Sequence, residues 1–492
     1  MVFNSTIFLF LFLPAFLALY FLAPGKLKNV VLILFSLVFY TWGSAMLVLL
    51  LLGSVILNFS GAIFIRKGFR VSGLSVLLIF NIGLLGYFKY CNFGLDALNG
   101  MLRMFHVHGV FFHPVTGLLL PLGISFYTFR AIAYVLDVYK GKTDPSTNFL
   151  EFCTWFTMFP LISAGPIVRY ATLQNQLTSR NISVDRFTEG MARFVTGLAK
   201  KVLIAGTFST VSQYVFSANL SEVSMVMAWT GIIAFTLEIY FDFSGYSDMA
   251  IGLGKMIGFD FPENFNYPYA ARDIREFWRR WHITLSNWLR DYLFLPVAYS
   301  LSRKLKNDSY FRIKTDYIIY AVATLVTFVL CGLWHGAAWT FVAWGFYFAV
   351  FLIMEQIFLG RLLKKLWPPL QHLYTILVVS CSFVIFKSAS LGDAFNFLGK
   401  LFSFSSGNPA VNSYIWFFCF NGQTLMATLA ALIFSVPAYG YLRQYAIVPG
   451  KTNSLIRLFL NTSAVLILGT LFIVTLSYLA SNTYNPFIYL RF

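Results

Sequence analysis

Charge is the most obvious shortage in this 492-residue sequence, because Asp, Glu, Lys and Arg together make up only 11% of it. Apolar residues make up 58%, and the mean hydropathy is +0.72. A water-soluble domain of this length does not need so many apolar side chains. Many runs also approach the ~20 apolar residues that cross a bilayer. These features exclude a soluble protein and predict a polytopic membrane protein surrounded by membrane lipid.

Acidic residues are the scarcer of the charged types, with 19 Asp and Glu against 36 Lys and Arg, a formal net charge of +17. An excess of basic residues is typical of nucleic-acid-binding proteins, and also of the cytoplasmic loops of membrane proteins. The basic residues here lie in short loops between apolar runs. This distribution favours membrane topology, and we expect no nucleic-acid partner.

Cysteine is also rare, and the five cysteines are scattered without a CxxC pair. They are typical of small buried hydrophobic residues, so neither disulfides nor a metal site is expected. The N-terminus lacks the basic start of a signal peptide, and Lys26 and Lys28 follow its apolar run. This order predicts an uncleaved first span with its N-terminus outside. Because no internal repeat or soluble domain is evident, residues 1–492 are expected to form a single membrane domain.

The apolar runs predict an all-α protein of about eleven to thirteen transmembrane and re-entrant helices. Residues 90–114 are expected to form an outside loop with three histidines, and residues 152–170, which contain prolines and a glycine, a broken or re-entrant helix. A polar cytoplasmic or re-entrant belt is expected at about 260–315, and an aromatic tail at 482–492. The later helices are expected at 191–217, 224–247, 316–334, 337–358, 372–390, 423–442 and 458–480.

The belt contains the stretch "EFWRRWHITLSNWLRDY" (276–292), which is rich in both arginine and tryptophan. The spacing of its large apolar residues predicts one amphipathic helix with its arginines on the opposite face. Such a helix is typical of a membrane interface, but that interpretation gives His282 no role. The apolar face would consist of Trp278, Trp281, Leu285, Trp288 and Tyr292, and the polar face of Arg275, Arg279 and Arg290.

A second histidine, His335, lies in "LCGLWHGAAWTFVAWG" (330–345) among small residues and tryptophans. A buried imidazole needs a hydrogen-bond partner, so one interpretation is a core histidine bonded to a backbone carbonyl. The other is a general base acting on a hydroxyl. Acidic residues inside apolar runs usually line a cavity, which marks Glu238, Asp242 and Asp248 as candidates. The glycines of "GLGKMIG" (252–258) indicate close helix packing.

Five motifs taken in order resemble the membrane-bound O-acyltransferase family, most closely its bacterial alginate O-acetylation branch. The resemblance covers nearly the whole chain. It is specific because the five motifs are separate and agree. They are "PLGISFYTFRAIAYVLDVYKG" (121–141), "FPLISAGPIVRY" (159–170), "FDFSGYSDMAIGLG" (241–254), "REFWRRWHITLSNWLRDYLFLPV" (275–297) and "GLWHGAAW" (332–339).

The resemblance implies a ring of tilted helices around a tunnel through the membrane. It also implies that His335 is the catalytic histidine and that His282, in "RRWH", is the second conserved polar position. Arg275, Arg279 and Arg280 would then lie near the phosphates of the acyl donor. Hydropathy instead places His335 at the outer tip of a hairpin, ~28 Å from the cytoplasmic end of a straight helix. We expect the tunnel position.

The implied activity is acetyl transfer from a cytoplasmic donor, acetyl-CoA, to hydroxyls of an extracytoplasmic polysaccharide such as alginate. The expected place is the bacterial inner membrane. The expected partners are an SGNH-type esterase-like protein and the polysaccharide synthesis machinery. D-alanyl transfer to teichoic acid is an alternative within the family, and a transporter or flippase is one outside it. In the aromatic tail, Tyr489 is a candidate acyl shuttle, and an interfacial anchor is the alternative.

Overall fold

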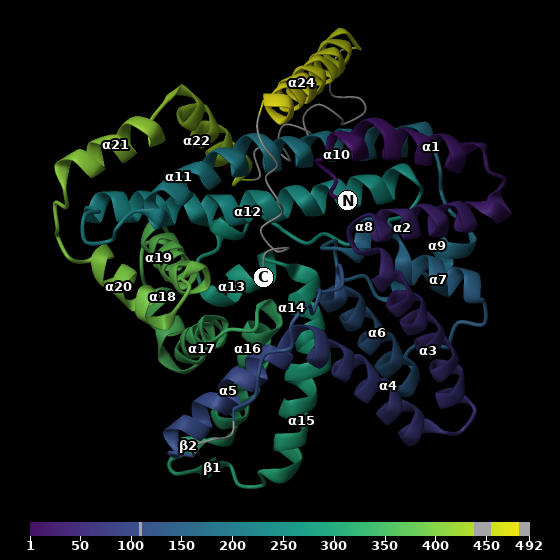
Figure 1. Cartoon of the computed structure of the whole chain (residues 1–492), viewed down its shortest axis with the longest axis horizontal. Helices are drawn as coiled ribbons and strands as arrows, with labels where there is room; N and C mark the ends of the chain where they lie inside the picture. Colours follow the sequence, from purple (N-terminus) through teal and green to yellow (C-terminus); the bar gives the residue numbers. More distant parts are fainter. Residues whose placement is uncertain (108–110, 437–453, 482–492) are drawn as a thin grey trace. The chain divides into compact units, whose positions relative to one another are not determined.

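The structure is a computed structural model that describes residues 1–107, 111–436 and 454–481 (Figure 1). Within these ranges the strands are limited to a two-residue hairpin, β1 (Ser309–Tyr310) and β2 (Ile313–Lys314), and the all-α prediction is confirmed. Nine helices in the described ranges are long and apolar enough to cross a membrane, or ten if one bent pair counts as a single span. The chain is therefore a multi-pass membrane protein. The eleven to thirteen segments expected from the sequence counted re-entrant helices together with the spans, so the two numbers do not count the same elements.

The chain packs as two compact units. The first comprises Met1–Met191, Ala250–Pro262 and Gly336–Ala338, and the second comprises Ala192–Met249, Glu263–His335 and Trp339–Phe492. Two long helices, α10 (Val184–Ala199) and α12 (Met225–Met256), contribute residues to both units. The prediction that residues 1–492 form a single membrane domain depends on how the two units are joined, and it stays a prediction.

The first unit is helical, and its wide or tight helical turns carry the label η. Its elements are η1 (Phe8–Phe12), α1 (Leu13–Leu22), η2 (Gly25–Leu27), α2 (Lys28–Ser44), η3 (Ala45–Leu47), α3 (Val48–Arg66), α4 (Arg70–Leu85), η4 (Gly86–Tyr90), α5 (Cys91–Met104), α6 (Ile124–Tyr139), α7 (Phe149–Thr157), α8 (Phe159–Ile162) and α9 (Tyr170–Thr178).

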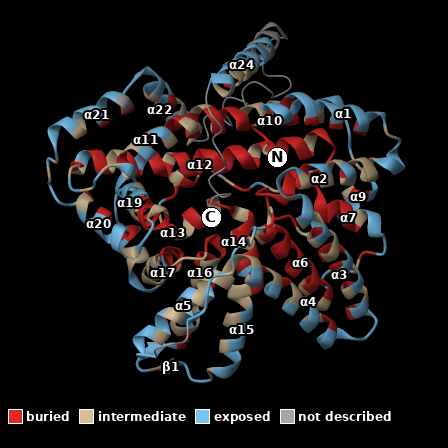
Figure 2. Ribbon diagram, viewed as in Figure 1, coloured by how far each residue is buried: buried red, intermediate tan, exposed pale blue. Residues whose placement is uncertain are grey.

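The broken segment between α7 and α9 forms the centre of this unit. All of residues 152–168 are buried (Figure 2, red). The ring of Phe159 packs against Phe12, Phe16 and Phe39, with centroid distances of 5.3, 5.1 and 5.6 Å. Aromatic rings at these separations contribute packing beyond their buried area. The predicted broken helix is confirmed, and protein surrounds it.

Two of the five motifs meet in the first unit through Gly123 and Arg130. Gly123 has φ +67°, and a Cβ there would lie 1.8 Å from the Ile162 carbonyl oxygen, so only glycine fits. The buried guanidinium of Arg130 donates to the carbonyls of Trp155 and Phe156 at 3.1 and 3.0 Å. Those carbonyls lie at the end of α7, where backbone acceptors lack helical partners. Arg130 therefore stabilises the break.

The prediction that residues 90–114 form a loop is wrong for the part up to Met104, which is helical. Residues Arg70–Met104 form one helical stretch in which α4, η4 and α5 follow each other without interruption. The loop expectation depended on three histidines, and these begin only after α5 ends, at His106. Because Cys91–Met104 contains no proline, nothing in the sequence interrupts the helix there.

The second unit holds the later spans. Helices fall on the predicted runs as far as the structure describes them, and residues 437–442 of the run at 423–442 lie outside the described residues. Its elements are η5 (Lys200–Ala205), α11 (Gly206–Ser217), η6 (Pro268–Ala270), α13 (Ile274–Arg280), α14 (Ile283–Leu289), η7 (Arg290–Phe294), α15 (Leu295–Lys304), α16 (Thr315–His335), α17 (Trp339–Met354), η8 (Glu355–Leu359), α18 (Gly360–Leu363), α19 (Pro368–Lys387), α20 (Leu391–Leu401), α21 (Pro409–Cys419), α22 (Gly422–Phe434) and α24 (Ser454–Ser481).

Glycine contacts hold α10 against α12. A Cβ on Gly197 would lie 2.6 Å from the Gly245 carbonyl oxygen in the second unit. In the first unit, a Cβ on Gly190 would lie 2.6 Å from the carbonyl oxygen of Gly252, within the Gly-rich stretch. Small residues let two helix backbones approach closely in a membrane. The predicted close packing is confirmed.

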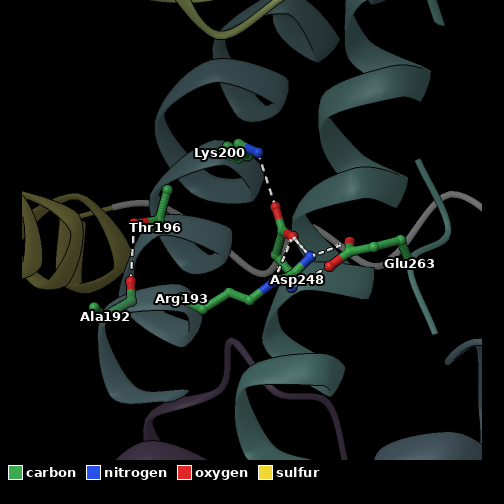
Figure 3. Close-up of polar contacts among 6 residues, drawn as sticks. All are labelled: Ala192, Arg193, Thr196, Lys200, Asp248 and Glu263. Carbon is green, nitrogen blue, oxygen red and sulfur yellow. Dashed lines mark hydrogen bonds and ion pairs between the residues drawn. The ribbon is translucent and has the colours of Figure 1, made fainter. Parts of the chain in front are cut away.

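The close approach places Arg193 and Lys200 beside Asp248 of α12 (Figure 3). Asp248 accepts from Arg193 at 2.9 Å and from Lys200 at 2.8 Å, and Arg193 also binds Glu263. Pairing offsets the cost of burying charge, although a buried pair adds little net stability. The other two acidic candidates are also paired, Asp242 with Lys201 and Glu238 with Lys387, and their place along a cavity stays a prediction.

Candidate active site

The belt stretch is two helices rather than one, so the single amphipathic helix predicted for 276–292 is wrong. α13 ends at Arg280 and α14 begins at Ile283, and between them His282 adopts the left-handed region with φ 43°. Two backbone hydrogen bonds hold the break to the preceding loop: Ile283 donates to the Asn264 carbonyl at 2.9 Å, and Asn266 donates to the Arg280 carbonyl at 2.9 Å. The spacing of apolar side chains could not predict this break, because these contacts are hydrogen bonds between backbone groups.

The interfacial interpretation is also wrong, because the aromatic side chains of the belt are buried in protein. Trp278 packs against Trp344 and Phe348, with ring centroids 5.9 and 5.1 Å apart. The outward face does match the prediction, since Arg279 and Arg290 are exposed. The five members of the predicted apolar face, Trp278, Trp281, Leu285, Trp288 and Tyr292, are all less than 9% exposed.

A carboxylate from another helix fixes the start of α13. Glu355 accepts the backbone N–H groups of Ile274 at 2.8 Å and Arg275 at 3.2 Å, and it also accepts the Tyr374 hydroxyl at 3.0 Å. The first N–H groups of a helix have no helical partner, and negative charge is favourable there. The sequence around Glu355 does not predict this role, because Glu355 lies 81 residues after Ile274.

His282 is fully buried and bound through one nitrogen. Its Nδ1 lies 3.1 Å from Asn264 Oδ1, whereas its Nε2 has no hydrogen-bond partner among the described residues. The ring packs edge-on to Phe243 at 4.7 Å and near Trp334 at 6.1 Å. Burial disfavours the charged form of a histidine and lowers the pKa of His282 to about 3. The side chain is therefore neutral.

His335 is the last residue of α16 and is 5% exposed. A glycine pair sets its position, because a Cβ on Gly332 would lie 2.1 Å from the Phe341 carbonyl oxygen, and one on Gly345 would lie 2.1 Å from the Phe328 carbonyl oxygen. α16 and α17 can therefore pack backbone to backbone. Described rings that pack against the imidazole include Trp334 and Trp344 at 4.9 Å and Phe386 at 5.4 Å.

Trp334 joins the two histidines, since its ring contacts both His282 and His335. The structure thus brings the two predicted catalytic residues into one aromatic cluster of the second unit. Hydropathy placed His335 at a hairpin tip, and the structure shows that the His335 side chain is buried there. The indole nitrogens of Trp278 and Trp344 are buried and lack a hydrogen-bond partner within the described part of the chain. They are donors available to a bound group.

The three predicted donor-binding arginines differ in their surroundings. Arg275 donates to Gln356 at 2.6 Å, and Arg280 forms an ion pair with Glu276 at 2.8 Å. Partial burial raises the pKa of the Glu276 carboxyl, but hydrogen bonds from the Arg272 backbone and from Arg280 hold it below its ordinary value. Arg279 is exposed, and its guanidinium has no hydrogen bond or ion pair among the residues that the structure describes.

Two further residues complete the comparison with the sequence. Tyr489, the predicted shuttle, lies outside the described residues, as does the rest of the tail 482–492. Asn264, the partner of His282, escaped sequence analysis. Its only signal was its place in "PENFNYP" (262–268), eighteen residues before His282.

The chain is similar in sequence to known proteins over most of its length. The model of the MBOAT family, described as membrane-bound O-acyltransferase, matches residues 145–386. A probable alginate O-acetylase of Azotobacter vinelandii is 41% identical, over 82% of this chain and 78% of its own. One from Pseudomonas putida (strain KT2440) is 35% identical over 100% of both chains. A peptidoglycan O-acetyltransferase of Helicobacter pylori is 32% identical, over 81% of this chain and 79% of its own.

These similarities set aside the transporter and flippase alternative. They cover both histidine motifs and most of the predicted spans. The chain belongs to the membrane-bound O-acyltransferase family and is an enzyme, an O-acetyltransferase.

Proposed function

We propose that this enzyme passes an acetyl group from a cytoplasmic donor, acetyl-CoA, across the bacterial inner membrane for O-acetylation of an extracytoplasmic polysaccharide such as alginate. The observation that carries the proposal is the buried pair of His282 and His335, joined by Trp334. The similarity to probable alginate O-acetylases over most of the chain supports the choice of acetyl group and polymer. The same names favour acetyl over D-alanyl transfer.

The proposed chemistry needs one base and one positioning group. His335 takes the proton of the accepting hydroxyl while the hydroxyl oxygen attacks the carbonyl carbon of acetyl-CoA. The carbon–sulfur bond then breaks, and the thiolate of CoA leaves with the proton that His335 received. His282 orients the donor or the acceptor. The buried indole N–H groups of Trp278 and Trp344 suit the oxygen on which negative charge develops.

Arg279 is the best placed of the predicted arginines for the donor. It is exposed, whereas Arg275 and Arg280 already bind protein groups. A guanidinium pairs well with phosphate oxygens, of which CoA has several. Arg279 would therefore bind the CoA portion, and the other two arginines would hold the belt in place.

Two parts of the proposal concern the far side of the membrane. An SGNH-type esterase-like protein and the polysaccharide synthesis machinery are the proposed partners. Tyr489 is the proposed carrier, because a phenol hydroxyl on a tail could take the acetyl group as an ester and pass it to a partner. Tyr489→Phe keeps an aromatic anchor and removes the hydroxyl, so polymer acetylation should fall in that variant. Acetylation at the wild-type level would leave the tail as an anchor.

The test of the whole proposal is complementation of a strain that lacks this gene, with acetyl content of the polysaccharide measured by NMR. Wild-type protein should restore acetylation and His335→Ala should not. His106→Ala, which removes an exposed histidine, is the matched control. Purified wild-type protein should also release free thiol from acetyl-CoA in the presence of acceptor. If wild type restores no acetyl groups, or if His335→Ala restores them fully, the proposal is wrong.

A further inference from the structure

The side-chain amide of Asn264 has only one orientation compatible with its neighbours. Its Oδ1 accepts the backbone N–H of Thr284 at 3.2 Å and the Thr284 hydroxyl at 2.9 Å. A backbone N–H can only donate, so the amide atom that faces it must be oxygen rather than nitrogen. The Asn264 side chain is fully buried, which leaves no water to replace this contact.

This orientation fixes the proton on His282. The same Oδ1 lies 3.1 Å from His282 Nδ1, and an amide oxygen carries no hydrogen. His282 Nδ1 must therefore be the donor of that bond. A neutral imidazole carries one N–H, so Nε2 is left with a lone pair and is an acceptor. Which tautomer a histidine adopts is inferred from such networks.

The acceptor atom lies where it has no hydrogen-bond partner in the described chain. His282 Nε2 is buried and unpaired, as is the Nδ2 of Asn264 beside it. A buried polar atom without a hydrogen-bond partner destabilises the folded protein, because it loses the hydrogen bond that water would supply. The left-handed backbone of His282, at φ 43°, adds strain of the kind that collects at functional sites. His282 therefore carries both an unpaired buried atom and a strained backbone. This combination points to a bound group that donates a hydrogen bond to Nε2.

Among the described residues, the rings in contact with His282 are not ionisable. The contacts are Phe243 of α12, Phe265 of the preceding loop and Trp334 of α16. Burial is the cause of the lowered pKa, and the imidazole stays neutral at physiological pH. A neutral acceptor suits a neutral N–H or O–H group rather than an anion or a phosphate.

We propose that Asn264 is a positioning residue that holds His282 as its Nδ1–H tautomer, so that His282 Nε2 accepts a hydrogen bond from an N–H or O–H group of the bound substrate. This inference rests on the proposed acetyl transfer. Two substrates carry such a donor, namely the amide groups of acetyl-CoA and the hydroxyls of the acceptor. The proton that His335 removes is a separate one.

The first experiment compares Asn264→Leu with Asn266→Leu in purified protein that is titrated with acetyl-CoA at a fixed level of acceptor. Both variants make the same chemical change, but the side chain of Asn266 is exposed. Asn264→Leu should lose about tenfold or more in kcat/KM, as is usual when the partner of a functional histidine is removed, and Asn266→Leu should match wild type. A raised KM for acetyl-CoA assigns the bond to the donor, and a lowered kcat assigns it to the acceptor. Equal activities in the two variants would overturn the proposal.

A second arm separates this role from a structural one. Asn264→Asp keeps the acceptor for Nδ1–H but adds a negative charge that favours the imidazolium. The variant should keep activity at high pH and lose it as pH falls, whereas wild type should show no such loss from His282 above pH 5. If Asn264→Asp follows the wild-type pH profile, or is inactive at every pH while folded, the proposal fails.

A third variant covers the case in which Asn264→Leu does not fold. His282→Asn keeps an amide N–H where Nδ1–H lies, and so keeps the bond to Asn264, but it has no atom at the position of Nε2. It should fold as wild type and lose at least as much activity as Asn264→Leu. A folded and active His282→Asn would contradict the proposal. Failure of the proposed function is a different result, because the wild-type protein itself would then release no CoA.

Discussion

His282 and His335 contact the same tryptophan, yet the protein holds them in different ways. His282 lies in a break between two short helices, where directed hydrogen bonds and a left-handed backbone fix it. His335 ends a long helix, where a glycine contact brings two backbones together and the rings of Trp334, Trp344 and Phe386 pack against the imidazole. Hydrogen bonds determine where a proton lies, whereas packing determines only where a ring lies. The hydrogen bond to Asn264 therefore fixes the tautomer of His282, and the glycine contact fixes the position of His335.

Replacing the two histidines should give the largest effects and should rank them. His335→Ala should abolish acetyl transfer, a loss of about 100-fold or more, because a general base contributes 10²–10⁴-fold. His282→Ala should impair transfer strongly but not completely. The measurement is CoA release by purified protein whose thermal unfolding matches wild type. The reverse order of severity would break the proposed division of roles.

Adding one methyl group at Gly332 should disturb His335 and leave His282 bound to Asn264. The new Cβ would lie 2.1 Å from the Phe341 carbonyl oxygen, and backbone cannot yield as a side chain can. Overpacking of this kind costs about 1–3 kcal/mol or more. Gly332→Ala should therefore lower the unfolding temperature in detergent.

Gly399→Ala is the matched control for this variant. Gly399 lies inside α20, and a Cβ there would have nothing within 4 Å. Alanine is the better helix former, so this change should leave the unfolding temperature equal or slightly raised. If the two glycine variants unfold at the same temperature, backbone contact does not fix the position of His335.

The pH dependence of stability should report on His282. Its pKa is about 3 in the folded protein against an ordinary value of 6.5, so the unfolded chain binds a proton that the folded chain excludes. The contribution is therefore complete above pH 6.5 and is lost as pH falls toward 3. The expected slope is about 1.4 kcal/mol per pH unit. Thermal unfolding from pH 7 to 5 should show it in wild type, and the slope should shrink in His282→Gln.

The smallest expected effect concerns the donor rather than either histidine. Arg279→Gln should raise the KM for acetyl-CoA several-fold and leave kcat unchanged, because an exposed charge contributes about 1 kcal/mol or less. Arg290→Gln is the control, since Arg290 is also exposed but pairs with its neighbour Asp291. If both variants have the wild-type KM, Arg279 does not bind the donor.

Long apolar runs made most of the fold predictable. Such runs can only be spans, and the helices α12, α16, α17 and α19 agree with them. The glycine contacts of α12 were also predictable, because glycine in a membrane helix has few other uses. His335 could be singled out by its unusual place among small residues and tryptophans.

The rest of the site depends on contacts between residues far apart in the sequence. The break at His282 follows from backbone bonds to Asn264 and Asn266, and periodicity records side chains only. Glu355 binds the start of α13 eighty-one residues before it. The basic partners of the acidic residues of α12 were not predictable, because a sequence shows a charge in a span and does not show its partner.

The wide π-helical turn η5, between α10 and α11, determines in which direction the side chains of α11 point relative to those of α10. Lys200, the first residue of this turn, binds Asp248 of α12, and beyond the turn Ser212 of α11 accepts from Lys387 of α19 at 2.6 Å. Such a turn holds an extra residue, and each residue of an α-helix rotates the chain by about 100°. Deleting one residue at Leu203 would turn Ser212 away from Lys387 while Lys200 stayed in place. One residue thus sets the rotation between two halves of a helix, and no substitution in either half could restore it.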